Sequence, residues 1–227
     1  KRQQYSRSID VNKFGGRFKY SKALNIIDDI DTAITSNITR VKIRRNLRAV
    51  LNSFAQYELC FGNQFRINQE GKNIKSTGFT IEGENEIVYI TDIPNKDNNG
   101  NLDGSGLGVI SIVREDSLRN TVVVVKSAGT VDYIHGEIIL TTVNITSTVK
   151  ENNVIEIQAF PDSNDVIGLK DLYLDFSISN TTINMVKDTI TSGEQISGVG
   201  FKVTSSYSNG ELTLSLIHIS EPTRPTD

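Results

Sequence analysis

Residues 14 to 47 read FGGRFKYSKALNIIDDIDTAITSNITRVKIRRNL, and their hydrophobic period changes halfway along. In the first half the apolar side chains recur every three or four residues, which places them on one face of a helix. These residues are Leu24, Ile27, Ile30 and Ile34. Ser21 lies just before them and is the N-cap that the pattern predicts. The stretch therefore predicts a short helix near the N-terminus.

A strand is predicted to follow this helix directly, because the period changes to two at Ile38. The apolar residues Ile38, Val41 and Ile43 should face one way and the cations mainly the other. Five cations form the candidate interface of the chain: Arg40, Lys42, Arg44, Arg45 and Arg48. Such a stripe suits an acidic partner surface. A solvated strand face is the alternative, and long cations also protect an edge strand from unwanted pairing.

Strands bounded by turn residues are predicted through most of the remaining chain. They cover residues 78–81, 87–91, 109–113, 122–126, 130–134, 137–148 and 154–160. Residues 172–179 alternate like a strand covered on one side, and residues 183–190 fit a short helix or another strand. In residues 46–57 helical spacing competes with a continued sheet edge or an irregular link.

The fold class that follows is α+β, in which a short N-terminal helical and strand module precedes a mainly antiparallel β region. We expect the α+β module in residues 1–70 and a β domain in residues 71–150. A β-rich C-terminal region should occupy residues 151–213. Within it, residues 193–210 are predicted to form a mobile arm or an edge element that orders on a neighbour.

Residues 214–227 are expected to be foreign to the protein. LSLIHISEPTR, at the start of this segment, translates a transposase adaptor used in preparing sequencing libraries. We therefore expect the segment to take no part in the fold and to be disordered. A natural C-terminal strand with a polar tail is the alternative. Because the chain also begins at Lys1 without a methionine, we expect a fragment that is cut at both ends.

The composition argues against several function classes. The formal net charge is −3, whereas general nucleic-acid binding normally shows a basic footprint. No apolar run approaches the roughly 18 to 20 residues that cross a bilayer, and no signal peptide is visible. The single cysteine, Cys60, supports neither a disulfide nor a metal knuckle. We expect no bound cofactor, no metal, no nucleic acid and no membrane.

Two glycine- and oxygen-rich patterns lie close together and suggest ligands. Asp97, Asn99 and Asn101 begin like a calcium loop, but Leu102 stands where that loop requires glycine. A hairpin loop is the prediction. The glycines at 104, 106 and 108 follow, yet the next residues predict a strand rather than the helix of a dinucleotide site.

Catalytic groups are sparse. His135 is the candidate general base, and its neighbour Gly136 predicts a turn or bulge, so a hydrogen-bonded turn histidine is the favoured interpretation. Asp132, Glu137 and Glu156 are carboxylates of the kind that glycoside hydrolysis uses in pairs, but acidic strand residues usually line a solvated face. No motif marks a nucleophile, so we expect no enzyme and no small-molecule substrate.

An ordered series of short motifs resembles one known family. The motifs are FGGRFKYSK (14–22), ITSNIT (34–39), VKIRRNL (41–47), CFGNQF (60–65), NIKSTGF (73–79), GTVDYIHGEI (129–138) and FPDSNDVIGLKDLYL (160–174). Together they resemble the C-terminal part of the baseplate wedge protein of large contractile-tailed bacteriophages. The resemblance covers residues 14 to 210 and is carried by the order of the motifs rather than by any one of them.

This resemblance implies a structural protein without an active site. Such a subunit associates with itself, as a dimer or ring, and with other baseplate wedge proteins around the tail hub. It is located in the tail baseplate of the virion and assembles in the cytoplasm of the host bacterium. A β-rich adhesin or carbohydrate-binding module is the alternative. Those modules usually display aromatic platforms, and this chain has no Trp and only seven Tyr.

Overall fold

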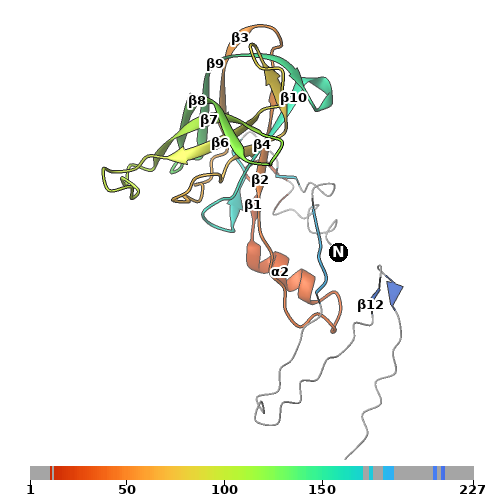
Figure 1. Cartoon of the computed structure of the whole chain (residues 1–227). Coiled ribbons are helices and arrows are strands. Elements are labelled where there is room, and N and C mark those ends of the chain that lie inside the picture. Colours follow the sequence, from red (N-terminus) through yellow and green to blue (C-terminus); the bar gives the residue numbers. More distant parts are fainter. Residues whose placement is uncertain are drawn as a thin grey trace, which may run out of the picture. The chain divides into compact units, whose positions relative to one another are not determined.

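The computed structural model describes residue 11 and residues 13–170, 174–175, 181–186, 207–208 and 211–212 (Figure 1). The chain divides into two compact units, residues 1–176 and 177–227. In the second unit a small hairpin pairs β12 (Tyr207–Ser208) with β13 (Glu211–Leu212), and residues 181–186 are exposed without helix or strand. The predictions for residues 214–227, and most of those for 172–179, 187–190 and 193–210, lie outside the described residues. The predicted domain boundaries at residues 70, 150 and 213 stay predictions.

One sheet dominates the first unit, and within the described residues it has nine strands. Their order is β2-β10-β4-β6-β7-β8-β9-β3, with β5 also paired to β9, and every pairing is antiparallel. The bounds are β2 Ile43–Arg48, β3 Phe54–Cys60, β4 Lys75–Ser76, β5 Phe79–Ile81, β6 Tyr89–Pro94, β7 Leu107–Glu115, β8 Thr121–Asp132, β9 Glu137–Thr148 and β10 Val154–Ala159. The predicted α+β class with a mainly antiparallel β region is confirmed.

The sheet curls so that its two edge strands, β2 and β3, approach each other (Figure 1). The Arg45 guanidinium of β2 reaches across and donates a hydrogen bond to the Cys60 carbonyl of β3. Alternate side chains point inward, because successive residues of a strand face opposite sides. On β10, for example, Ile155 and Ile157 are fully buried. The main hydrophobic core therefore lies inside the curled sheet.

A smaller module precedes the sheet. The short strand β1 (Arg17–Phe18) pairs with β11 (Val166–Ile167), and α2 (Tyr20–Asp28) follows at once. Val11, Phe18 and Val166 form a second buried cluster, against which Tyr20, Ala23, Ile26, Val41, Ile43 and Leu174 pack. The helix thus packs on neighbouring residues such as Phe18 and also on Val166, which lies far from it in the sequence.

The predicted helix exists, but its ends differ from the prediction. It begins at Tyr20 after Lys19, so the prediction that Ser21 is the N-cap is wrong. The Asp165 carboxylate accepts the Tyr20 N–H at 2.8 Å and takes the part that a local cap would play. At the other end the helix stops at Asp28, so Ile30 lies beyond it and is 48% exposed.

The predicted strand also begins later than expected. Residues 29–42 have no strand and separate α2 from β2. Ile38 is 93% exposed, so the prediction that it shares one strand face with Val41 and Ile43 is wrong, whereas Val41 and Ile43 do pack on the second cluster. The Tyr20 hydroxyl donates to the Thr39 carbonyl at 2.9 Å, which ties this segment back to the helix instead of to a neighbouring strand.

Most of the later strands agree with their predicted ranges. Strand β9 spans residues 137–148 as predicted, while the predicted strands 122–126 and 130–134 merge into the single strand β8. The pairing of β7 with β8 shifts register between Ile110 and Val113, which accounts for the interrupted pattern. Residues 46–57 continue the sheet edge and form no helix. They contain the end of β2, a short turn and the start of β3.

Candidate protein interface

The predicted cations do not share one face, because β2 alternates. Arg44 and Arg48 point outward with Asn46, and Lys42 lies exposed just before the strand. Register confirms this placement, since Arg44 lies opposite Gln158 and Arg48 opposite Val154 on β10. These three cations therefore lie on the outer surface of the curled sheet.

The two remaining predicted cations lie elsewhere. Arg45 is half-buried on the inward side of β2, where it bonds the Cys60 carbonyl, so it serves the contact between the two edge strands. Arg40 is exposed in the irregular segment before β2. The structure thus brings together three of the five predicted interface residues.

Two further cations, which the sequence argument missed, join the same surface. Lys75 of β4 is exposed and lies opposite Gln158, which itself lies opposite Arg44. Two strand spacings, about 10 Å, therefore separate Lys75 from Arg44. Lys150 lies in the turn after β9, and its ammonium nitrogen is 3.4 Å from the Glu156 carboxylate. We call Lys42, Arg44, Arg48, Lys75 and Lys150 the basic face.

Glu156 organises one part of the basic face. Its Oε1 atom lies 3.1 Å from Arg44 Nη1 and 3.4 Å from Lys150 Nζ, so one carboxylate oxygen holds two cations. Glu151 is exposed beside Lys150. Five cations and these two carboxylates leave a net charge of +3 on the face, since five minus two is three. The Lys42 ammonium lies 5.1 Å from the centre of the Phe160 ring, a cation–π contact that restrains its side chain.

The loop that resembled a calcium site is a hairpin connection. The Asp97 Oδ1 atom accepts the backbone N–H groups of Asn99 and Asn101 at 2.8 and 2.9 Å, which closes the turn. The three glycines that follow lead into strand β7 rather than into a helix. Within the described ranges no cluster of three or more His, Cys, Asp or Glu side chains is placed to hold a metal ion.

His135 lies in the β8–β9 turn, as the sequence predicted. Asp132 accepts the His135 backbone N–H at 2.9 Å, and this bond lowers the pKa of the Asp132 carboxyl. Its other oxygen lies 2.8 Å from His135 Nδ1, and this hydrogen bond raises the pKa of the imidazole. Because the His135 side chain is 70% exposed, the pair stabilises the turn at the surface and forms no enclosed catalytic site.

The other candidate carboxylates have separate tasks. Glu156 is bound to Arg44 and Lys150, while Glu137 lies 3.7 Å from the Cys60 thiol. Burial, followed by a hydrogen bond to Glu58, raises the pKa of Cys60, which keeps it a thiol at neutral pH. Asp132 and Glu137 are register partners on β8 and β9. These carboxylates do not converge on one cleft.

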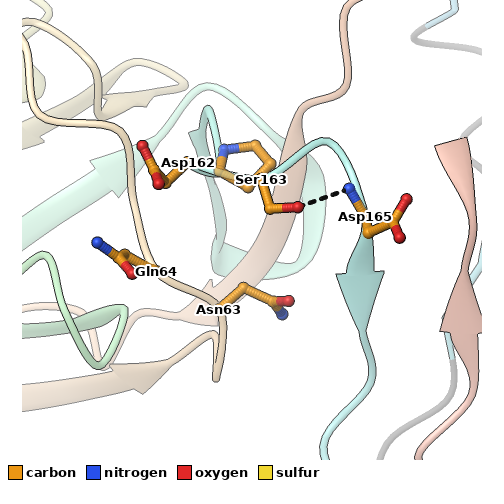
Figure 2. A pocket seen from close by; sticks show the side chains of 6 residues that line it. Asn63, Gln64, Asp162, Ser163 and Asp165 are labelled. Atoms are coloured by element: carbon orange, nitrogen blue, oxygen red, sulfur yellow. Dashed lines mark hydrogen bonds between the residues drawn. The ribbon is translucent and has the colours of Figure 1, made fainter.

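A small polar pocket lies between the loop after β3 and the loop before β11 (Figure 2). Its volume is about 70 Å³, and it is lined by Asn63, Gln64, Pro161, Asp162, Ser163 and Asp165. Cavities that enclose small organic ligands usually measure about 300 to 1,000 Å³. Two of the lining side chains form hydrogen bonds with the chain's own backbone. Ser163 Oγ accepts the Asp165 N–H at 3.1 Å, and the Asn63 side chain forms hydrogen bonds of 2.8 and 2.9 Å with the backbone of Ile167.

Asp165 links this pocket to α2, and replacing it with Ala should loosen the helix. The Tyr20 N–H would lose its acceptor, and capping losses of this kind reduce stability by about 1 kcal/mol. Circular dichroism and hydrogen exchange of the α2 amides give the measurement. Asp165→Asn is the control, because an amide oxygen still accepts the bond. Equal exchange in Asp165→Ala and wild type would contradict the capping role.

Comparison with known proteins gives one finding. A family model described as "Baseplate structural protein gp6, C-terminal domain III" matches residues 2–46, which are 45 of the 227 residues of the chain. Among the described elements the match takes in β1, α2 and the first four residues of β2. No curated protein matches the chain. No helix in the described part of the chain is long and apolar enough to span a membrane.

The match confirms the resemblance to a phage baseplate structural protein over residues 2–46. It indicates a structural role in the baseplate, and hence a place in the virion tail. It also includes Arg40, Lys42 and Arg44, so the basic face begins inside the matched segment.

Proposed function

We propose that the chain is a structural subunit of a phage baseplate wedge that associates with itself and with other wedge proteins to build the ring around the tail hub. The observation that carries the proposal is the match of residues 2–46 to a domain of a baseplate structural protein. The side chains that suggested catalysis are engaged in turns and ion pairs, which agrees with a protein that works through its surfaces.

The basic face is the part of the surface that best fits this task. Arg44, Arg48 and Lys75 lie on the paired strands β2 and β4, which hold them in a fixed arrangement, while Lys42 precedes β2 and Lys150 lies in the turn before β10. Charged surfaces of this kind set the orientation and rate of association more than the affinity. The preferred partners are therefore acidic surfaces of wedge proteins.

Reversing three cations of the basic face should weaken binding without unfolding the chain. In the variant Lys42→Glu, Arg48→Glu, Lys75→Glu, Arg44 is kept because its partner is Glu156. Exposed charges of this kind contribute below about 1 kcal/mol each to stability, so the melting temperature should change little. Co-purification with the wedge proteins of the same phage, at low salt, measures binding.

The matched control is Lys96→Glu, Arg119→Glu, Lys126→Glu. It makes the same change in net charge with exposed cations outside the basic face. The proposal expects binding to fall in the first variant and to persist in the control. If the first variant binds as well as the wild type, the basic face is a solvated surface and not an interface.

A further inference from the structure

Three apolar side chains meet at one point on the outer surface of the sheet. Ile87 lies before β6 and is 46% exposed, and Val149 follows β9 and is 63% exposed. Tyr89 begins β6 and faces outward, because its neighbour Ile90 belongs to the main core. Atoms of all three side chains surround the position that a Cβ atom of Gly78 would take. We call Ile87, Tyr89 and Val149 the apolar patch.

Gly78 allows this convergence. Its φ angle lies outside the left-handed region, so the backbone conformation alone does not require glycine here. A Cβ atom would instead lie well inside van der Waals contact of Ile87 Cγ2 and 3.1 Å from Val149 Cγ2. The Gly78 carbonyl also accepts the Val149 N–H at 3.1 Å, which fixes the residue after β9 beside it. The absence of a side chain at residue 78 therefore lets apolar groups from two separate segments lie together at the surface.

The apolar patch adjoins the basic face. Lys150 follows Val149 directly in the chain. Lys75 of β4 lies opposite Thr91, which points to the same side of β6 as Tyr89. Two cations of the basic face therefore border the patch, one at Val149 and one at the strand next to Tyr89.

The carboxylates closest to the patch in the sequence are engaged with a cation of their own. Glu86 directly precedes Ile87 and lies 2.7 Å from Arg114 Nη1, and Glu84 lies 3.8 Å from Arg114 Nε. This group adds a net charge of −1 to the +3 of the basic face. The surroundings of the apolar patch thus remain positive.

Exposed apolar side chains bordered by charges have the composition of a protein interface. Contiguous apolar surface with a polar rim marks interaction sites on soluble proteins. The charges of such a surface guide association, whereas the apolar side chains at its centre supply most of the affinity. The positive border selects an acidic partner, and the patch selects an apolar side chain on that partner.

We propose that the apolar patch, together with the adjoining cations of the basic face, seats an acidic segment of another wedge protein. One aliphatic or aromatic side chain of that segment packs against Ile87 and Val149, and the carboxylates that flank it face Lys75 and Lys150. This inference rests on the proposed function and specifies its contact. The cations then set the rate of association, and the apolar side chain sets the rate of dissociation.

Binding kinetics of the full chain with the wedge proteins that co-purify with it test this division. The variant Ile87→Thr with Val149→Thr keeps β-branched side chains but places two hydroxyl groups in the patch. Its dissociation rate should rise about tenfold, while its association rate should stay within about twofold of the wild type. The charge variant Lys42→Glu, Arg48→Glu, Lys75→Glu should instead associate more slowly, and its association rate should depend less on salt.

The matched control is Ile134→Thr with Ile167→Thr. It makes the same chemical change at exposed isoleucines of the β8–β9 turn and of β11, which are not part of the apolar patch. Both of its rates should equal those of the wild type. The melting temperatures of the patch variant and the control should change little, because all four side chains are exposed.

A wild-type dissociation rate in the patch variant, with slower association in the charge variant, would overturn the apolar contact and leave the proposed function in place. If the patch variant alters only self-association, measured by sedimentation equilibrium, a second copy of the chain occupies the patch and the proposed occupant is wrong. A wild-type chain that binds no wedge protein would remove the proposed function together with this contact.

Discussion

Replacing Asp92 with Ala is expected to lower the free energy of unfolding by about 2 to 5 kcal/mol. Asp92 lies on β6 and is fully buried. Its Oδ1 atom accepts the Ile74 N–H at 2.6 Å, and its Oδ2 atom accepts the Tyr133 hydroxyl at 2.7 Å. Without the carboxylate two buried donors lose their acceptor, at about 1 to 3 kcal/mol each. Denaturant unfolding monitored by circular dichroism measures the loss.

Tyr133→Phe and Tyr57→Phe give a matched comparison for this site. Tyr133→Phe removes one donor to the buried carboxylate, and we expect a loss of about 1.5 to 3 kcal/mol. Tyr57→Phe makes the same chemical change at an exposed hydrogen bond with the Val50 N–H, and its effect should stay below about 1 kcal/mol. Equal effects at the two positions would show that burial adds nothing to the Asp92–Tyr133 bond.

The pH dependence of the Asp92 contribution has a definite sign. Burial raises the pKa of the Asp92 carboxyl above its ordinary value of 3.8, and the bonds from Ile74 and Tyr133 offset only part of this effect. A carboxyl whose pKa is higher in the folded chain stabilises it most below the unfolded pKa, and that contribution is lost as the pH rises through the folded pKa.

Asp92→Asn isolates this titration, because the amide keeps the size of the side chain and stays neutral. The stability of the wild type relative to Asp92→Asn should therefore fall as the pH rises from about 4. A difference that grows with pH would contradict the raised pKa. Because Ile74 directly precedes Lys75, the Asp92 bond also positions one cation of the basic face.

Strong local β propensity made much of the sheet predictable. Residues 137–148 form a long run rich in Ile, Val and Thr that follows the turn residue Gly136, so their strand could be predicted from the sequence. Strand β4 has only two residues, which is too short to show a period, and its Lys75 was missed for that reason. Lys150 joins the basic face through Glu156, a contact that no local pattern encodes.

The errors at α2 have the same physical origin. Ser21 satisfies the local rule for an N-cap, but Asp165, 145 residues away, supplies the acceptor for Tyr20. Arg44 and Arg45 are consecutive, so strand alternation alone excludes that both point outward. That signal was available in the sequence. Which of the two faces the core depends on the pairing with β10, and tertiary register decides it.

Replacing Gly136 with Ala is expected to lower the free energy of unfolding by about 3 to 5 kcal/mol, because two penalties add at this residue. Its φ angle is +68°, a conformation that L-residues adopt at a cost of about 1 to 2 kcal/mol. A Cβ atom here would also lie well inside van der Waals contact of the Asn63 backbone carbonyl. The turn therefore fits against residue 63 only without a side chain. Denaturant unfolding measures the change.

Gly104→Ala separates the two penalties. Its φ angle is +76°, but no atom lies within 4 Å of the position that a Cβ would take. It should therefore lose only the conformational part, about 1 to 2 kcal/mol. Asn63 also pairs with the backbone of Ile167 in β11, so Gly136→Ala should increase hydrogen exchange at β1 and β11, whereas Gly104→Ala should not. If both variants lost the same stability, the close approach of the turn to Asn63 would not constrain residue 136, and the link from the β8–β9 turn to the N-terminal module would have to run through other contacts.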